Sequence, residues 1–300
     1  MSDFKKEYEV CTLCARACGT NRYERAGACG MTATAYISRA ALHAWEEPII
    51  SGDRGSGTIF FSGCSLSCVF CQNKEISRGR VGVPVSTERL AEIMMKLESD
   101  GAHNINFVTP THFTPTVIVA TKRARAMGLT VPIVYNTSSY ENEKTVRSLD
   151  GTVDIYLADY KYNLPKTARL YSNAENYPTV ARAAIAEMVR QNGSPVIKDG
   201  IMQSGVIVRI LLLPGHVAEA KLSVKYLYES YGDGIYLSLM SQYTPMPGMT
   251  PPLDRRVSRA EYDELVDYAL SKGVKNAFIQ DGSAAMESFI PPFDLTGCND

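Results

Sequence analysis

Three closely spaced cysteines follow an apolar stretch in this sequence. Cys64, Cys68 and Cys71 are separated by three and then by two residues. Thiolates this close together are typical metal ligands, yet a closed zinc or iron–sulfur site usually has four protein ligands. Three thiolates can hold three corners of a four-iron cluster and leave the fourth iron open to an exogenous chelating ligand. The alternative is a zinc site that a distant residue such as His112 completes.

A second group of cysteines lies near the start of the chain. Cys11, Cys14, Cys18 and Cys29 fall within nineteen residues, a density that favours a closed four-thiolate metal site over a chance cluster of buried cysteines. Zinc and an auxiliary iron–sulfur cluster both accept four thiolates. The segment is too small to fold unaided, and a structural zinc ion would supply the missing free energy. We assign no role to Cys298.

The composition is that of a soluble globular protein. Of the 300 residues, 45% are hydrophobic and 21% are charged, and the formal net charge is −1. This balance gives no overall attraction to nucleic acid or to a membrane surface. The first residues lack a signal-peptide pattern, and no run approaches the roughly 18 apolar residues of a membrane-spanning helix. We therefore expect a cytoplasmic protein, in which clustered cysteines bind metal more often than they form disulfides.

The elements that position these cysteines alternate along the chain. Short apolar runs rich in Val, Ile, Tyr and Phe predict parallel strands over residues 58–62, 104–109, 131–136, 154–159, 206–213 and 235–240. Amphipathic patterns predict helices over residues 87–100, 178–192 and 258–272. Strands that alternate with helices in this way form a doubly wound sheet or a barrel, which is an α/β fold in either case.

Polar side chains follow the predicted strands at their C-terminal ends, where ligands bind in such folds. These candidate binding residues are Cys64, Thr109, Thr111, His112, Asn136, Thr137, Asp159, Lys161 and His216. Asp159 and Lys161 are two residues apart on an extended segment, so both can face the interior. Asn136 and Thr137 are suited to hydrogen-bonding a ligand, although a helix N-cap would explain them equally well.

Arg209 lies inside an apolar run that has no other polar side chain. A buried guanidinium without a partner would be costly. Its planar donors match the carboxylate of a ligand, and the alternative is a buried ion pair with Asp154 or Asp159.

Several stretches resemble one known family. The sequence from Cys64 to Cys71, with Phe70 before the last cysteine, resembles the C-x3-C-x2-C signature of the radical S-adenosylmethionine (SAM) superfamily. "CQN", which ends at Asn73, is similar to the "CHN" of glycyl-radical-enzyme activases. "DIYLADYKY" and "VIVRILLLPGH" resemble their strand-four D-x-K element and strand-five arginine segment. Over roughly residues 10–270 the chain resembles the pyruvate formate-lyase-activating-enzyme-like branch.

This resemblance implies a partial (β/α)6 TIM-like barrel, a [4Fe–4S] cluster on the three cysteines and SAM on the open iron. The reduced cluster of such enzymes cleaves SAM to methionine and a 5′-deoxyadenosyl radical, which abstracts hydrogen from a C–H bond. The likeness places Phe70 and Asn73 beside the cofactors, Asp159 and Lys161 on SAM, and Arg209 near the SAM carboxylate. It also implies anaerobic chemistry, a flavodoxin- or ferredoxin-type electron donor and a glycyl-radical-enzyme partner.

The chain departs from the family pattern after the second strand. Many members have a Gly-Gly-Glu-like element there that binds the SAM amino group, whereas residues 108–115 read VTPTHFTP. Thr109, Thr111, His112 or backbone carbonyls must serve instead.

Three regions are expected along the chain. Residues 1–50 would form the cysteine-rich metal-binding extension, 51–245 the radical SAM core and 246–300 a C-terminal extension. A lid built over residues 241–300, with Tyr243, Tyr262 and Phe289, would exclude a peptide loop and favour a small metabolite as substrate. The remaining alternatives are another peptide substrate and a non-catalytic metal-binding or sensing protein.

Overall fold

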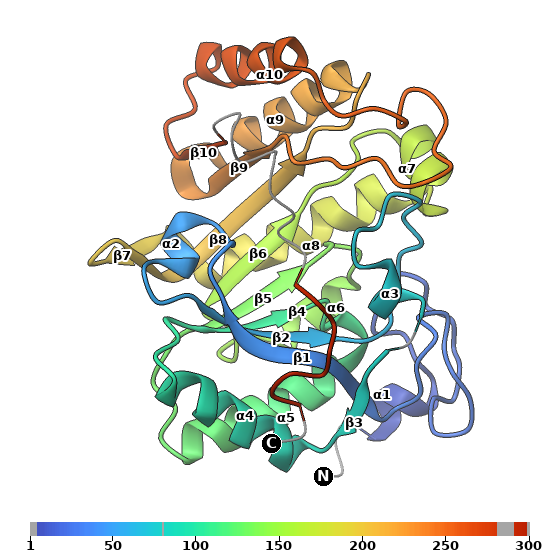
Figure 1. The fold of residues 1–300 in the computed structure, drawn as a ribbon, viewed down its shortest axis with the longest axis vertical. Helices are drawn as coiled ribbons and strands as arrows, with labels where there is room; N and C mark the ends of the chain where they lie inside the picture. Colours follow the sequence, from blue (N-terminus) through green and yellow to red (C-terminus); the bar gives the residue numbers. More distant parts are fainter. Residues whose placement is uncertain (1–4, 80, 281–290, 299–300) are drawn as a thin grey trace.

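The protein is built on one ten-stranded sheet. The computed structural model describes residues 5–79, 81–280 and 291–298. Within them the strand order is β10-β9-β8-β6-β5-β4-β2-β1-β3, and β7 pairs with β8 outside this path (Figure 1). The six predicted strands are confirmed as the parallel centre of the sheet. They are β2 (Ser56–Phe61), β4 (Ile105–Val108), β5 (Ile133–Thr137), β6 (Ile155–Asp159), β8 (Ile201–Leu211) and β9 (Tyr236–Met240).

Four further strands extend this centre. β1 (Ala35–His43) runs antiparallel to β2 and also pairs with β3 (Val83–Val85). β10 (Ala277–Ile279) runs parallel to β9, and β7 (Val196–Lys198) forms a hairpin with β8. The sheet therefore crosses both expected region boundaries, since β1 lies before residue 51 and β10 lies after residue 245. Those boundaries stay predictions.

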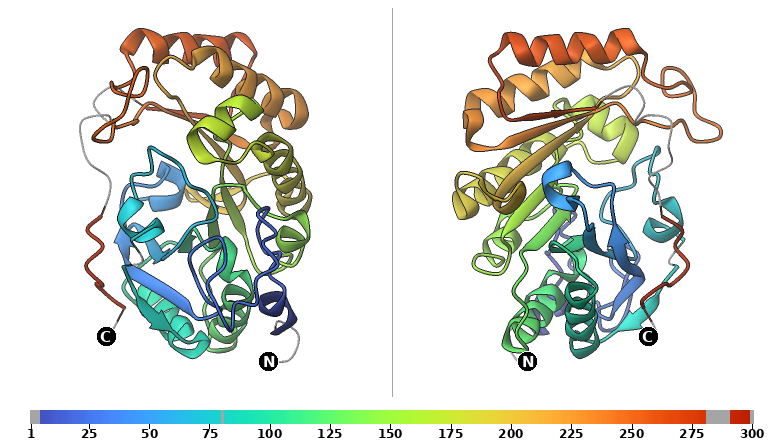
Figure 2. Two further views of the ribbon diagram at one scale, coloured as in Figure 1. Left: turned by 90° about the vertical axis from the view of Figure 1, so that its right-hand side faces the viewer. Right: turned by 60° about the vertical axis from the view of Figure 1, so that its left-hand side comes forward.

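The three predicted helices are present as α4 (Thr87–Ser99), α8 (Tyr177–Asn192) and α10 (Arg259–Ser271). Ser86 caps α4 by accepting from the Arg89 amide, and Ser258 forms the predicted capping box with Glu261. The other helices are α1 (Lys5–Glu9), α2 (Pro48–Ser51), α3 (Lys74–Ser77), α5 (Thr114–Ala126), α6 (Glu143–Arg147), α7 (Pro165–Ser172) and α9 (Val217–Tyr231). Turned views place β1 and α2 on one side of the parallel strands and α8 on the other (Figure 2).

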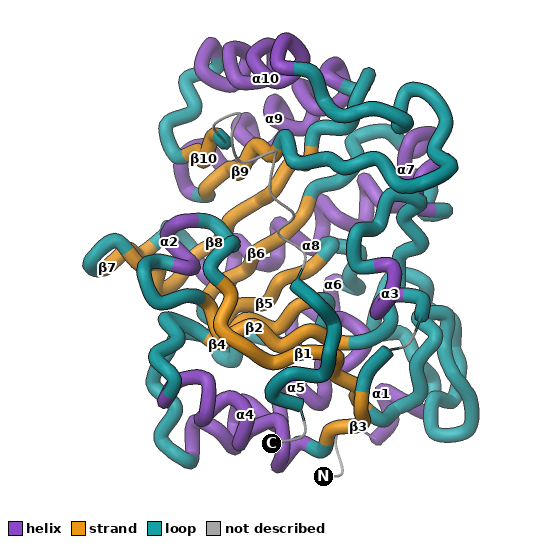
Figure 3. Tube along the Cα trace, in the orientation of Figure 1, coloured by secondary structure: helices purple, strands orange, loops and turns teal. Residues whose placement is uncertain are grey.

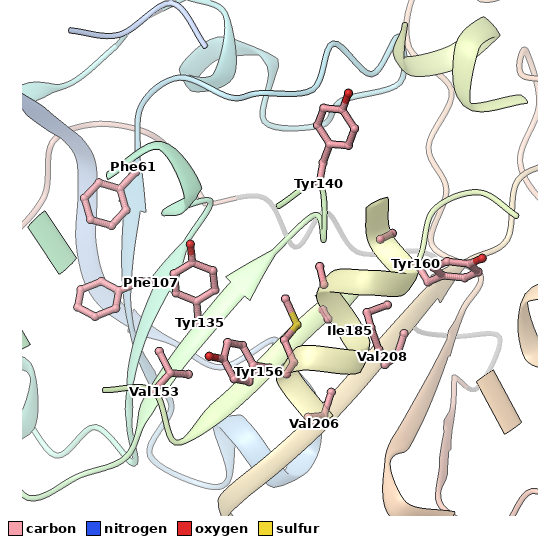
Figure 4. Close-up of a cluster of buried hydrophobic side chains, with 14 of the residues drawn as sticks. Phe61, Phe107, Tyr135, Tyr140, Val153, Tyr156, Tyr160, Ile185, Val206 and Val208 are labelled. Atoms are coloured by element: carbon pink, nitrogen blue, oxygen red, sulfur yellow. The ribbon is translucent and has the colours of Figure 1, made fainter. Parts of the chain in front are cut away.

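The two faces of the parallel strands carry different side chains because successive residues of a strand point to opposite faces. On the helix-covered face the core contains Tyr135, Tyr156 and Val206, and Ile185 of α8 packs in the same cluster (Figure 4). These side chains are fully buried. This face is therefore the main hydrophobic core.

The opposite, inner face changes from apolar to polar along the strands. Near the strand starts, Val134, Ile155 and Ile207 pack in a small cluster with Ile50 of α2. One or two residue pairs further on, the same face presents Asn136, Asp159, Arg209 and Ser238, on four neighbouring strands. Register brings Asp159 opposite Arg209 and Arg209 opposite Ser238. The sequence thus places an apolar floor beneath a polar row.

No helix among the described residues is long and apolar enough to cross a membrane.

Candidate active site

One cavity of about 800 Å³ lies over the polar row of the inner face. The cysteine loop after β2 and the C-terminal ends of the parallel strands both line this cavity. Figure 3 traces the backbone of these strands and of the loop segments between the elements. The sequence-predicted residues that line the cavity are Cys64, Cys68, Phe70, Cys71, Asn73, Thr109, Asn136, Thr137, Asp159, Lys161 and Arg209. Side chains from five parallel strands or the loops after them therefore share one space, as expected for the C-terminal ends of such strands.

The cysteine loop is held by hydrogen bonds to its thiols. The Leu66 amide donates to Cys64 Sγ (3.4 Å), and the Ser172 hydroxyl donates to Cys68 Sγ (3.0 Å). Cys71 Sγ lies 3.4 Å from the Ser77 hydroxyl. Cys64 and Cys68 each accept a hydrogen bond, and burial raises the pKa of Cys64 to about 12, so ionisation of this thiol needs a positive partner such as a metal.

Aromatic rings fix the same loop from the cavity side. Phe70 contacts Tyr162, Tyr171 and Tyr243 edge-on, with ring centroids 6.0–6.4 Å apart. The Val69 amide donates to the Tyr171 carbonyl (2.9 Å). Phe70, the aromatic residue before the last cysteine of the signature, is buried, and its ring contacts hold the loop in place.

Asp159, Lys161 and Arg209 form one ion-pair network. Lys161 Nζ lies 2.6 Å from Asp159 Oδ2, and Arg209 Nε lies 2.7 Å from Asp159 Oδ1. The ion pair of Arg209 with Asp159 that the sequence left open is therefore present. Arg209 Nη2 also donates to Asn136 Oδ1 (2.7 Å), and Nη1 donates to Glu46 Oε2 (3.3 Å). All three guanidinium nitrogens of Arg209 therefore have an acceptor.

Burial and charge compete at these groups. Burial opposes ionisation of Asp159, but the positive charges of Arg209 and Lys161 outweigh it and hold the pKa of Asp159 below its ordinary value. Burial likewise opposes the charge of Lys161, while Asp159 and the nearby Cys68 raise the pKa of Lys161 above its ordinary value. The network therefore keeps two cations and one carboxylate ionised at neutral pH, next to the cysteine loop.

Two acidic residues that sequence reasoning missed also line the cavity. Glu46 and Glu47 lie between β1 and α2 and reach the polar row from across the inner face. Glu46 Oε2 lies 3.3 Å from Arg209 Nη1, and Glu46 Oε1 accepts from Asn106 (3.0 Å) and Asn136 (3.2 Å). In the sequence they are two adjacent acidic residues before Pro48 and two isoleucines. Nothing in this spacing is typical of a metal, catalytic or ligand-binding motif.

Three predicted site residues lie outside the lining of this cavity. Thr111 and His112 belong to a buried 3-10 turn (Thr111–Phe113) that does not line the cavity. Thr111 donates to Glu141 (2.7 Å), and His112 Nε2 lies 2.8 Å from the Ser62 carbonyl oxygen. His216 pairs instead with Tyr171 (2.9 Å) at the start of α9. The turn after Pro110 redirects the chain, which the linear sequence did not reveal.

Thr109 stays in the cavity and has unusual backbone geometry. Its φ is +58°, in the left-handed region that a β-branched residue rarely adopts. Its amide donates to the Asn136 carbonyl (2.9 Å), which holds the strained residue at the end of β4. Strain of this kind is concentrated at ligand-binding positions.

The expected lid residues have different roles. Tyr243 lines the cavity, and its hydroxyl donates to the Leu253 carbonyl (2.6 Å). The Tyr262 hydroxyl donates to the Leu239 carbonyl (2.8 Å), so Tyr262 is buried against the sheet and does not cover the mouth. Phe289 lies outside the described residues.

The four N-terminal cysteines lie together beside the cysteine loop. Cys11, Cys14 and Cys29 are buried, and Cys18 is exposed. The Cys64 amide donates to the Cys29 carbonyl (3.3 Å), so the two cysteine-bearing segments touch directly. Within the described ranges, no three His, Cys, Asp or Glu side chains converge closely enough to hold one metal ion. This finding applies to both cysteine groups.

Arg22 is buried among the N-terminal cysteines. Its side chain is 0% exposed and stacks on Tyr8 and Phe113. It donates to the carbonyls of Met31, Thr32 and His112, and its Nη1 lies 3.9 Å from Cys11 Sγ. No carboxylate in the described part of the chain forms an ion pair with it. A buried guanidinium of this kind requires a negative partner.

Comparison with known proteins identifies the family. A family model described as the radical SAM superfamily matches residues 58–221, which is more than half of the 300 residues. The chain belongs to the radical SAM superfamily. A protein of Methanocaldococcus jannaschii, uncharacterized protein MJ0674, is 28% identical over 274 residues, which cover 88% of this chain and 75% of that protein.

Solved structures resemble this chain at low sequence identity. Methylornithine synthase (PylB) has a TM-score of 0.50 and 16% identity, over 86% of this chain and 67% of that one. A domain of pyruvate-formate lyase-activating enzyme from Bacteroides vulgatus has a TM-score of 0.41 and 16% identity, over 56% and 92%. SuiB of Streptococcus suis, bound to the precursor peptide SuiA, has a TM-score of 0.48 and 11% identity, over 71% and 46%.

Radical SAM proteins hold a [4Fe–4S] cluster and SAM, and the cavity residues fit both. Three thiols line the cavity, and its described lining contains no fourth cysteine. Such a donor set leaves one iron for an exogenous ligand. In the same cavity, Lys161 and Arg209 offer the positive charge that a carboxylate needs. The sequence-based expectation of this cofactor pair is consistent with both the family and the donor set.

Proposed function

We propose that this protein is a radical SAM enzyme that cleaves SAM reductively and transfers a hydrogen atom from a substrate C–H bond. The observation that carries the proposal is the shared cavity, which is lined by Cys64, Cys68 and Cys71 and by Lys161 and Arg209. A reduced cluster on these three cysteines would supply the one electron that the reductive cleavage of SAM to methionine and 5′-deoxyadenosine requires, with the hydrogen atom coming from the substrate.

The residues of this chain bind and orient, and none acts as an acid or base. Lys161 is the cavity-lining cation whose charge acts on both Cys64 and Cys68. We assign the SAM carboxylate to Lys161, with Arg209 behind it. Arg209 must share or exchange one of its present acceptors to take part, since Asp159 and Asn136 already occupy its donors.

The SAM amino group lacks an acidic partner after β4. We assign it to the backbone of Thr109, whose left-handed conformation exposes the end of β4 to the cavity. Asn136 and Thr137 then remain for the ribose hydroxyls. Phe70 and Asn73 keep the cysteine loop in place beside them.

For the substrate, we propose a glycyl-radical-enzyme-type protein partner, with a flavodoxin- or ferredoxin-type electron donor. This choice is supported by the likeness of "CQN" and of the Asp159–Lys161 segment to activases. A different peptide or a small metabolite is the second candidate, supported by the acidic residues Glu46 and Glu47 in the cavity. A purely sensing role is disfavoured because a sensor needs no carboxylate-binding set across from its metal.

The test is anaerobic turnover of the reconstituted protein with SAM and dithionite. We expect 5′-deoxyadenosine and methionine in equal amounts. Deuterated host extract, separated into protein and small-molecule fractions, then reports the substrate: deuterium in 5′-deoxyadenosine from the protein fraction alone supports an activase. Absence of 5′-deoxyadenosine while the three cysteines hold a cluster contradicts the proposed activity.

We further propose that Cys11, Cys14, Cys18 and Cys29 hold a second metal centre, either zinc or an auxiliary iron–sulfur cluster. Four thiolates around either metal leave a net negative charge. That charge would neutralise Arg22, which is otherwise a buried cation without a carboxylate. Metal analysis of the Cys64→Ala, Cys68→Ala, Cys71→Ala triple variant separates the two metals. Zinc alone supports a structural site, residual iron with sulfide supports a cluster, and no metal contradicts the proposal.

A further inference from the structure

Of the acidic pair, Glu46 supports the SAM site proposed above through Arg209 and Asn136, whereas Glu47 has no part assigned in it. Their segment fits closely onto the inner face, because Ile49 and Ile50, directly after Pro48, pack into the apolar floor of the barrel. The two carboxyl groups are thereby held over the polar row. A loop anchored in this way presents its side chains at fixed positions, which is what a binding site requires.

The two carboxyl groups differ in their partners. Both oxygens of Glu46 have donors, from Asn106, Asn136 and Arg209. Glu47 is only 8% exposed, and its Oε2 has no hydrogen-bond partner. A buried carboxyl oxygen without a donor is costly, so a ligand that donates a hydrogen bond to Glu47 Oε2 would be stabilised in the cavity.

The charges that line the cavity have the same implication. Its described lining contains three carboxyl groups, Glu46, Glu47 and Asp159, and two permanent cations, Lys161 and Arg209. Burial lowers the pKa of His43, the histidine in the lining, which leaves that ring neutral. Burial also raises the pKa of Glu47. A positively charged ligand group would donate to Glu47 Oε2 and would favour the ionised form of this carboxyl group.

The position of Glu47 separates it from the cysteine loop. Its close neighbours are Arg209 and Ser238, on β8 and β9, whereas Lys161 is the charged neighbour of Cys64 and Cys68.

From these observations we infer that the substrate carries a protonated nitrogen, as an amine or a guanidinium, and that Glu47 binds this group at the β8–β9 side of the cavity. Ser238 orients the Glu47 carboxylate, and Glu46 neutralises Arg209 so that Arg209 does not repel the incoming cation. The inference rests on the proposed function, since it concerns the substrate of the same cavity. It applies both to a basic side chain of a peptide and to a small amine.

The test is calorimetric binding of simple probes to the reconstituted enzyme with SAM and without reductant. The probes are n-butylguanidinium, n-butylammonium, neutral n-butylurea and anionic pentanoate. We expect the cations to bind at least about tenfold more tightly than n-butylurea, with the weakest binding for pentanoate. Equal affinity for n-butylurea and the cations, or tighter binding of pentanoate, overturns the inference.

Variants assign the effect to Glu47. We expect Glu47→Gln to reduce the preference for cations to less than about threefold, and Glu47→Asp to retain it with lower affinity. Glu88→Gln, on the outer surface of α4, is the control and should behave as wild type. Thermal melts check that each variant is folded. An unchanged preference in folded Glu47→Gln overturns the assignment, as does a tenfold loss of SAM affinity without loss of cation preference.

The source of the cation is resolved by a second pair of probes. Acetyl-Gly-Arg-Gly-amide presents a guanidinium on a peptide, and n-butylguanidinium presents it alone. Tighter binding of the peptide supports a basic peptide segment, tighter binding of the free cation supports a small amine, and binding of neither overturns the inference. Because no reductant is present, these results are independent of 5′-deoxyadenosine formation, which tests the proposed function.

Discussion

The two cysteine groups of this protein touch, yet their surroundings differ. Cys64, Cys68 and Cys71 line a cavity of about 800 Å³, and the charged residue they face is Lys161. The N-terminal cysteines line no part of that cavity, and their cation, Arg22, is fully buried beside Cys11. We call the cavity group the open site, and the N-terminal group, for which a four-thiolate centre is proposed, the closed site. Both groups consist of cysteines, so what separates them is access to the cavity.

The largest expected effect comes from removing one ligand of the open site. Cys68→Ala should lose the cluster of the cavity and all measurable 5′-deoxyadenosine, because three thiolates are the minimum set there. Cys298→Ala, which removes another buried cysteine, should keep wild-type activity. Iron content and product formation are the measurements. Activity in Cys68→Ala would remove the distinction between the two groups.

The closed site is tested most directly through Arg22. Arg22→Met should lower the free energy of unfolding by about 3–5 kcal/mol, because it leaves a buried negative centre without its cation. It should also weaken metal retention at the N-terminal cysteines. Arg25→Met, at an exposed position in the same segment, is the control. Stability and metal content should be followed in parallel. An Arg22→Met protein that retains both would show that Arg22 serves no metal centre.

These two sites also differ in how far the sequence revealed them. The spacing of Cys64, Cys68 and Cys71, and the period-two placing of Asp159 and Lys161, predicted residues that do share a cavity, because local geometry decides them. Contacts made by irregular segments were not predicted. Glu46 and Glu47 reach the cavity from a loop outside the expected core, and His112 turns away because of the chain direction after Pro110. The burial of Arg22 was not predicted either, since it depends on packing between distant segments.

A third prediction concerns the junction between the N-terminal segment and the barrel. Glu141, which forms a β-bridge with Cys14, is buried and accepts from Thr111 and Thr137. Burial raises the pKa of Glu141 to about 7. Since the folded pKa exceeds the unfolded value of about 4.5, the stabilisation is complete below that lower value and is lost as the pH rises toward 7.

Urea unfolding between pH 4.5 and 8 measures this effect. The wild type should lose about 3 kcal/mol over the window, whereas Glu141→Gln should lack this contribution. Glu143→Gln, on the exposed surface of α6, controls for general charge effects. Identical pH profiles for wild type and Glu141→Gln would contradict the account of this junction.

The smallest expected effect is on the reduction potential of the cluster at the open site. Ser172 donates to Cys68 Sγ and contacts the Tyr162 hydroxyl (2.6 Å). Ser172→Ala removes a hydrogen bond to sulfur, which should lower the reduction potential of the cluster by roughly tens of millivolts. Ser148→Ala, far from the loop on the sequence and bonded to the Thr145 carbonyl, is the control. Redox titration followed by electron paramagnetic resonance gives the potential, and an unchanged value would show that this donor does not tune the cluster.

The central claim, that only the cavity cysteines leave an iron open, is tested most directly by Mössbauer spectroscopy of protein reconstituted with ⁵⁷Fe, before and after addition of SAM. The account predicts that SAM changes the signal of one iron in the cluster held by Cys64, Cys68 and Cys71. Any iron at the N-terminal cysteines should be unaffected. A spectrum that SAM leaves unchanged, or a change that survives loss of the three cavity cysteines, would contradict the account.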